Sequence, residues 1–312
     1  MKACLNSWKP NISRQVGDVM SDVIASPSVR RLAGQKGVDL AKLARDLGRQ
    51  TIAREDLDAT PRPAAAAAAG CSYWDVDHSQ YGPVTEEPMS RFAQVASRNL
   101  TAAQALIPAV THHDQADISA VEAFRASLKP KALARGVKLT TLAFHVKALA
   151  QVLHEFPRFN ASLSVDGETL ILKNYIHIAV AVDTEFGLMV PVIRNADRKG
   201  LWQIAAEISD LAKRAQNRKV RPDEMGGASM TITNLGGIGG TAFTPIVNPP
   251  EVAILGITRT QIATIWDSDI PTPKPMAPLD LSYDHRVING AEAARFMVRF
   301  TKLLTDPRRM LT

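Results

Sequence analysis

The chain has 312 residues, of which 46% are hydrophobic and 22% charged, and its formal net charge at pH 7 is +6. This is the composition of a globular protein, and the length fits one large domain with a small second one. Two cysteines, Cys4 and Cys71, cannot form a disulfide framework, so we expect a reducing, cytoplasmic location. No apolar run is long enough for a membrane span or a secretory signal, and we expect neither.

The positive charge is concentrated near the start of the chain. Residues 1–62 hold 11 Lys/Arg against 7 Asp/Glu. A small basic module favours an acidic partner surface. Aromatic residues make up only 5% of the chain and do not alternate with basic ones, so nucleic acid is not an expected partner.

The sequence TPRPAAAAAAG at 60–70 marks the clearest boundary. Prolines and a run of alanines form no buried face and behave as a tether between domains. We therefore expect an N-terminal extension at 1–24, a small domain at 25–59, a linker at 60–75 and a large domain at 76–312.

The small domain shows two short helical patterns. Ser26 is the predicted N-cap of the first, Pro27 its first residue and Gly37 its end. The second begins near Ala53. The ARDLG sequence that precedes it is not typical of a regular turn.

The large domain mixes helical and strand patterns. Amphipathic helices are predicted at 88–106, 118–128, 139–156 and 200–219, and strands at 175–183, 188–194, 228–236, 251–266 and 279–285. The elements do not alternate as strict βαβ units. The predicted fold class is therefore α/β in the broad sense, an α+β two-layer arrangement with a mixed sheet covered by helices.

The glycine-rich sequence LGGIGGTAF at 235–243 resembles a phosphate-binding loop only superficially. A dinucleotide-binding loop opens a helix, whereas TAFTPIVNPPE, with three prolines, follows here. A loop where two backbones approach closely is the better interpretation.

Other common site motifs are missing. His112 and His113 are adjacent, so on an extended chain they point to opposite faces, and no second ligand cluster accompanies them; we expect no metal site. His145 lies in an apolar helical pattern and is expected in the core. No GxSxG sequence is present.

His285 lies in the run SYDHRVING, where a predicted strand meets the last helix. Asn289 is in the N-cap position of that helix, with Glu292 three residues later as in a capping box. By itself, this position is more typical of a structural histidine than of a reactive base.

The sequence DHRVING, preceded by TITNLGGIGGTAFTPIVNPPEVAILGI and IHIAVAVDTEFGLMVPVIRNADRKG, resembles the catalytic domain of the dihydrolipoamide acyltransferases over residues 76–312. These are the E2 components of 2-oxo acid dehydrogenase complexes. VDHSQYGPVTEEPMSRF most resembles the pyruvate-type acetyltransferases. The resemblance implies a chloramphenicol-acetyltransferase-like fold.

The resemblance also implies acyl transfer between dihydrolipoamide and coenzyme A. His285 would be the general base, and the Thr233 hydroxyl would stabilise the oxyanion where the family usually has serine. Asn289 stands where the family usually has aspartate; we expect it to hold the turn. The implied assembly is a homotrimer within a larger cubic core, with Thr233 and His285 contributed by neighbouring chains. Acetyl-CoA would be a substrate, its contact residues are unassigned, and the lipoyl group would come from another chain.

The small domain resembles the peripheral subunit-binding domain, through ASPSVRRLAGQKGVDL and REDL. The resemblance implies E1 or E3 enzymes as partners. The family's GxGxxGRI turn reads RDLGRQTI here, with Gly48 out of register and Thr51 where arginine usually stands.

Three functions remain open from the sequence. The first is a working acetyltransferase, and the second is an architectural subunit of an E2 core with little catalysis. The third is a stand-alone acetyltransferase of the chloramphenicol type, against which the 236–257 segment and the small domain argue.

Overall fold

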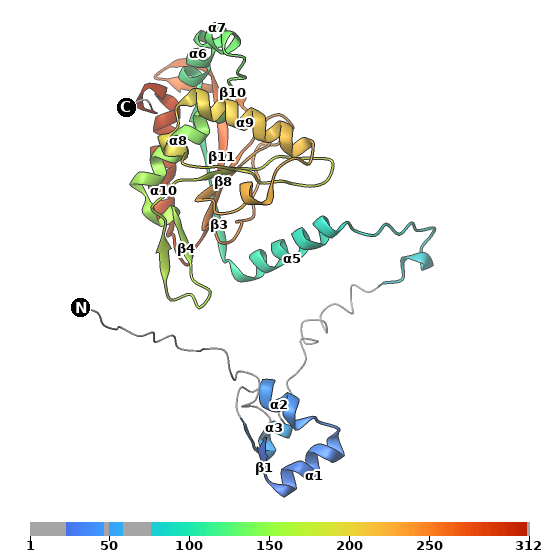
Figure 1. Ribbon diagram of the computed structural model, residues 1–312. Helices are drawn as coiled ribbons and strands as arrows, with labels where there is room; N and C mark the ends of the chain where they lie inside the picture. Colours follow the sequence, from blue (N-terminus) through green and yellow to red (C-terminus); the bar gives the residue numbers. More distant parts are fainter. Residues whose placement is uncertain (1–22, 47–49, 59–75, 311–312) are drawn as a thin grey trace, which may run out of the picture. The chain divides into compact units, whose positions relative to one another are not determined.

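The computed structural model describes residues 23–46, 50–58 and 76–310 (Figure 1). The chain divides into two compact units, Met1–Glu87 and Pro88–Thr312. The predicted linker 60–75, both cysteines, Gly48 and nearly all of the predicted N-terminal extension lie outside the described residues.

In the first unit, helix α1 (Pro27–Lys36) packs with α2 (Leu40–Asp46) and α3 (Arg54–Asp58), and β1 (Ile24–Ala25) pairs in parallel with β2 (Thr51–Ile52). Ser26 caps α1 by accepting a hydrogen bond from the Val29 N–H, and Gly37 ends it at φ 64°. Both were predicted. The small core consists of Val29, Ala33, Leu43, Ala44, Ile52 and Leu57. A short 3-10 turn, η2 (His78–Gln80), also belongs to this unit.

Helix α2 corrects the prediction of only two helices in this unit. Asp39 supplies its N-terminal cap, accepting from the N–H groups of Ala41 (2.9 Å) and Lys42 (3.3 Å). Leu43 and Ala44 are then buried. A single turn of apolar spacing is too short to be recognised as periodic, so packing rather than pattern defines this helix.

The second unit contains the following elements. Its helices are α5 (Arg91–Leu106), α6 (Ser119–Ser127), α7 (Lys129–Ala134), α8 (Thr141–Glu155), α9 (Leu201–Gln216) and α10 (Gly290–Thr305). Its strands are β3 (Ala109–Asp117), β4 (Ala161–Leu163), β5 (Leu170–Leu172), β6 (Ile178–Val180), β7 (Val192–Ile193), β8 (Met230–Asn234), β9 (Ala253–Ile257), β10 (Gln261–Asp267) and β11 (Ile270–Asp284). The 3-10 turns are η3 (Pro157–Phe159), η4 (Ala196–Arg198), η5 (Pro222–Glu224) and η6 (Pro307–Met310).

Seven strands form one mixed sheet in the order β10-β11-β9-β8-β6-β7, with β3 also paired to β11. The β6–β8 and β8–β9 pairs are parallel, and the others are antiparallel. Strands β4 and β5 form a separate hairpin. This mixed arrangement confirms the predicted fold class.

Strand β11 is the longest and departs most from the prediction. The predicted strand 279–285 is only its end, because the proline-rich segment from Ile270 onward is also extended. Pro271, Pro273 and Pro275 alternate along it and pair with β10. Prolines at every second position place their missing N–H groups on one edge, so pairing through the other edge survives. The predicted strand 251–266 is in fact two strands, β9 and β10, which both pair with β11.

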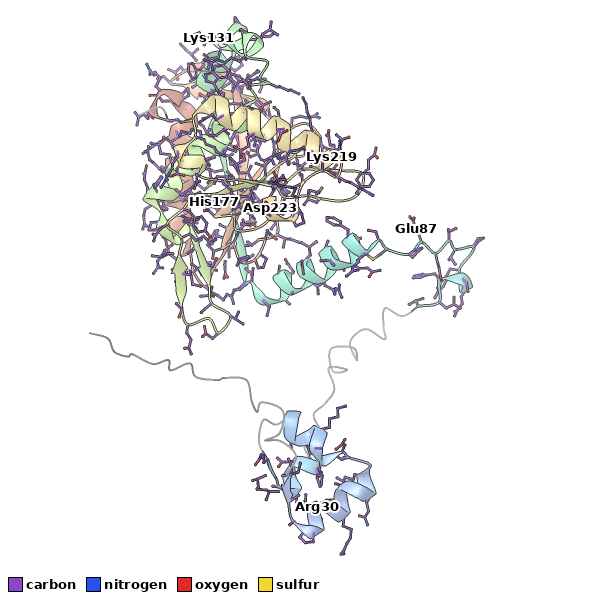
Figure 2. The ribbon with its side chains drawn as sticks, in the orientation of Figure 1. Arg30, Glu87, Lys131, His177, Lys219 and Asp223 are labelled. Carbon is purple, nitrogen blue, oxygen red and sulfur yellow. The ribbon has the colours of Figure 1, made fainter. Side chains whose placement is uncertain are left out.

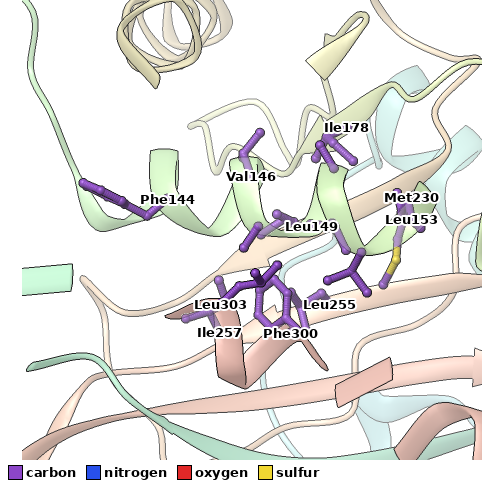
Figure 3. Packing of buried hydrophobic residues seen from close by; sticks show 14 of the residues in the cluster. Phe144, Val146, Leu149, Leu153, Ile178, Met230, Leu255, Ile257, Phe300 and Leu303 are labelled. Atoms are coloured by element: carbon purple, nitrogen blue, oxygen red, sulfur yellow. The ribbon is translucent and has the colours of Figure 1, made fainter. Parts of the chain in front are cut away.

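The main core lies between the sheet and its helices. Figure 3 shows Leu149 and Leu153 of α8 packed with Phe300 and Leu303 of α10, against Leu255 of the sheet. Phe159 stacks on Phe296 with ring centroids 4.0 Å apart. This layer fixes the sheet, and with it the ends of β8 and β11.

Candidate active site

The sheet has one apolar and one polar face. Along β11, Leu279, Leu281 and Tyr283 belong to the helix-covered core, whereas the alternate residues Asp280, Ser282 and Asp284 point the other way and are also buried. Residues in register on neighbouring strands share a face. The polar face therefore also carries Thr231, Thr233, Thr111 and His113.

His285 follows the last residue of β11. Its backbone N–H donates to the Pro108 carbonyl at 3.1 Å, which fixes the main chain beside β3. The side chain is exposed, and its ring lies 5.8 Å from that of buried Tyr283. In the part of the chain that the structure describes, no hydrogen bond reaches its ring nitrogens. The imidazole is thus held at a fixed point and accessible to a substrate.

The residues on either side of His285, Asp284 and Arg286, form an ion pair with each other. Arg286 donates through Nε and Nη2 to both carboxylate oxygens of Asp284, at 2.6 to 3.1 Å. Asp284 is 2% exposed and also accepts the Arg286 backbone N–H. The hydrogen bond to Asp284 raises the pKa of the Arg286 guanidinium. This two-point pairing closes the turn around His285.

Asn289 caps helix α10. Its backbone is extended (φ −91°, ψ 160°), and its side-chain oxygen accepts from the Glu292 N–H at 2.9 Å. The predicted N-cap is confirmed. His285 and Asn289 therefore stand on one strand-to-helix turn, which the Val287 and Ile288 N–H groups tighten by bonding to the Asp284 carbonyl.

Thr233 lies half-buried near the end of β8, far from His285 of the same chain. The register places Thr233 level with Gly256 of β9, and Gly256 level with Asp280 of β11. His285 is five residues beyond Asp280, or roughly 16 Å along the strand direction. Within one chain the two residues cannot contact the same reacting group.

Comparison with known proteins gives consistent matches. Residues 81–312 match the model of the 2-oxoacid dehydrogenases acyltransferase (catalytic domain) family, and residues 23–49 match the e3 binding domain. The chain is 48% identical over 301 residues to the dihydrolipoyllysine-residue acetyltransferase component of the pyruvate dehydrogenase complex of Azotobacter vinelandii, covering 93% of this chain and 47% of the relative. The chain belongs to the 2-oxoacid dehydrogenase acyltransferase family.

Two solved structures are similar to the catalytic part. One is Azotobacter vinelandii dihydrolipoamide acetyltransferase (E2p), studied for the role of one serine, one histidine and one asparagine in its catalytic mechanism. The other is the cubic core of the pyruvate dehydrogenase multienzyme complex. Each is 51% identical, with a TM-score of 0.75, and covers 76% of this chain and 98% of that chain. The chain spans about half the length of the curated relatives it matches.

The acyltransferase fold here contains a buried acid that the sequence analysis missed. Glu251 is 5% exposed and lies 2.9 and 2.7 Å from the Thr231 hydroxyl through its two carboxyl oxygens. Burial raises its pKa to about 7. A threonine hydroxyl donates only one hydrogen, so both short contacts are satisfied when the carboxyl is protonated. Nothing in the run NPPEV distinguishes this glutamate from a surface one.

A second missed pair crosses the polar face. His113 Nδ1 lies 2.6 Å from Asp280 Oδ1, and the hydroxyls of Thr111 and Ser282 are 2.7 Å apart. His112 and His113 do point to opposite faces, as predicted. The alternation in LDLSYD was a usable signal, because it places three polar side chains on one face of a buried strand.

Two other histidines have structural positions. His145 is 3% exposed in α8, as predicted, and burial lowers its pKa to about 4. His177, labelled in Figure 2, accepts the Asn195 N–H through Nδ1 at 3.0 Å. Within the described ranges, no group of three or more metal-ligating side chains occurs. No described helix is long and apolar enough to cross a membrane.

A cavity of about 520 Å³ adjoins the His285 turn. Helix α5 forms one wall, the segment 247–252 and the tip of the β4–β5 hairpin form others, and Asp284 and Arg286 reach it from the turn.

The glycine-rich loop 235–243 opens no helix, as expected.

Proposed function

We propose that this chain transfers an acetyl group between dihydrolipoamide and coenzyme A, as the E2 component of a pyruvate dehydrogenase complex. One observation carries the proposal. In the Azotobacter enzyme, the histidine follows the serine by 52 positions and precedes the asparagine by four. In this chain His285 follows Thr233 by 52 positions and precedes Asn289 by four. Asparagine rather than aspartate therefore occurs in both proteins, which supports activity with an amide at this position.

The chemistry needs a base and an oxyanion donor. A thiol is a weak nucleophile at neutral pH until a base removes its proton. The His285 ring takes the proton from the attacking thiol and returns it to the leaving thiol. The Thr233 hydroxyl donates to the oxygen of the tetrahedral intermediate, as the serine hydroxyl would. The extra methyl group of Thr233 restricts its χ1 angle but keeps the donor.

Because Thr233 and His285 of one chain lie roughly 16 Å apart along the strands, the complete site requires two subunits. A closed trimer supplies three such sites by repeating one heterologous contact. The exposed edge strand β10 supports this assembly. Ile262 and Trp266 are 72% and 66% exposed on it, beside Ile270 of β11 at 68%. Such an apolar edge fits a subunit interface.

The proposal extends to larger assemblies. The similarity to a cubic core supports trimers that assemble further, and the match of residues 23–49 supports docking of an E3-type partner on the small domain. Coenzyme A and dihydrolipoamide are the two thiol substrates, and the dihydrolipoamide is presented by a lipoyl domain.

The test is acetyl transfer from acetyl-CoA to free dihydrolipoamide by the full chain, with a His285→Ala variant beside it. We expect His285→Ala to lower the rate by about a hundredfold or more, since general base catalysis typically contributes that factor. His154→Ala, at a 60% exposed histidine of α8, is the matched control and should keep full activity. Inactivity of a folded, trimeric wild-type chain would contradict the proposal and leave the architectural role.

A further inference from the structure

Thr233 belongs to a row of residues that crosses the polar face of the sheet. Thr233 is in register with Gly256, Gly256 with Asp280, and Asp280 with His113. Side chains in such a row point to the same face and stand about 5 Å from their neighbours. Whatever occupies the Gly256 position is therefore the next neighbour of Thr233 along this row.

That position is filled by an aromatic ring from another segment. A Cβ placed on Gly256 would lie 2.7 Å from both Cε1 and Cζ of Phe243 and 3.2 Å from the Asp280 Cβ. The Phe243 ring thus rests directly on the Gly256 backbone, between Thr233 and Asp280. Any side chain at position 256 would displace it.

Hydrogen bonds to the loop that carries Phe243 hold the ring in this position. Asp280, 1% exposed, accepts the Phe243 backbone N–H through Oδ2 at 3.3 Å and contacts His113 Nδ1 through Oδ1 at 2.6 Å. Two residues earlier, the Thr241 carbonyl accepts the Thr258 hydroxyl at 3.1 Å. The loop that carries Phe243 is therefore bonded to Asp280 of β11, which His113 of β3 contacts in turn, and to Thr258 at the end of β9.

On the opposite side of Thr233, the nearest residue in the row is Ala181. Ala181 donates its N–H to the Ile232 carbonyl at 2.9 Å, so a small side chain follows the end of β6 there. The bulky group nearest to Thr233 along the row is thus Phe243.

We infer that Phe243 is the wall of the acyl pocket and sets the largest acyl group that the enzyme transfers. The inference rests on the proposed function, in which the acyl carbonyl oxygen lies about 3 Å from the Thr233 hydroxyl. An acyl substituent begins one bond from that carbonyl carbon, so a methyl group fits beside the ring and a branched chain meets it. Asp280 and His113 are positioning residues, because they act only through the ring.

The test compares acetyl-CoA with isobutyryl-CoA as donors to free dihydrolipoamide, for the wild-type chain and the series Phe243→Leu, Phe243→Val and Phe243→Ala. We expect the ratio of kcat/KM for isobutyryl-CoA to that for acetyl-CoA to rise stepwise as the side chain shrinks. The total rise should be about tenfold or more, the usual range for one or two methylene groups in a fitted pocket.

A second pair of variants tests the hydrogen bond between Asp280 and the Phe243 N–H. Asp280→Ala frees the loop and should raise the same ratio, whereas Asp280→Asn keeps a carbonyl oxygen for the Phe243 N–H and should resemble the wild type. Equal losses with both donors in a folded Phe243→Leu trimer would show that the ring is only structural and overturn the inference. If the wild type transfers neither group, it is the proposed function that fails.

Discussion

His285 depends on its two neighbours for its position. The bidentate pair between Asp284 and Arg286 and the bond from the His285 N–H to Pro108 fix the backbone on both sides of the ring. The imidazole itself stays exposed and unpaired among the described residues. The proposed role of His285, a base that acts on thiols from two different carriers, needs this combination of fixed main chain and accessible ring.

The role of the Asn289 side chain can be tested by single substitutions. Because the Asn289 oxygen accepts the Glu292 N–H, Asn289→Ala should lower the free energy of unfolding by about 1 kcal/mol and reduce acetyl transfer. Asn289→Asp keeps an acceptor oxygen and should keep both properties. Urea unfolding would measure the stability, and acetyl transfer to free dihydrolipoamide would measure the activity. An aspartate variant that is stable but inactive would show that the amide does more than cap the helix.

The elements differ in how far the sequence predicts them. Long amphipathic helices with clear caps, such as α1 after Ser26 and α10 after Asn289, follow from local rules. Strand β11 does not, because three of its prolines are tolerated only through pairing on one edge. The cap of Asn289 and the core position of His145 follow from spacing. The acid Glu251 and the Phe243 ring at Gly256 depend on which distant segments meet.

Helix α8 carries a built-in acid sensitivity. His145 is fully buried, its Nε2 has no hydrogen-bond partner among the described residues, and burial lowers its pKa from 6.5 to about 4. As the pH falls below 6.5, His145 of the unfolded chain binds a proton, whereas His145 of the folded chain stays neutral. Stability should therefore decrease between pH 6.5 and 4, by about 3 kcal/mol from this group.

His145→Leu should remove this slope, as measured by urea unfolding from pH 7 to pH 4.5. The comparison with the wild type isolates the histidine, because Glu251, which acts in the opposite direction, is present in both proteins. Its folded pKa is raised from 4.5 to about 7, so its contribution is present below pH 4.5 and lost as the pH rises toward 7. An unchanged slope in the leucine variant would show that His145 does not cause the acid sensitivity.

At the scale of the whole molecule, activity should depend on assembly. Replacing Ile262 and Trp266 of β10 by glutamate places charges on the proposed subunit interface. We expect monomers in analytical ultracentrifugation, an unchanged circular dichroism spectrum and loss of acetyl transfer. Leu133→Glu, at an 84% exposed leucine of α7, is the control that should stay trimeric and active. Active monomers would contradict a site shared between subunits.

The most direct measurement is subunit complementation between two inactive variants, Thr233→Ala and His285→Ala. Each alone leaves every site without one of its two groups. In randomly mixed trimers obtained by coexpression, about a quarter of the sites combine an intact Thr233 from one subunit with an intact His285 from its neighbour. We predict that the coexpressed protein recovers about that fraction of wild-type acetyl transfer. A mixture as inactive as its components would contradict a site built from Thr233 and His285 of neighbouring chains.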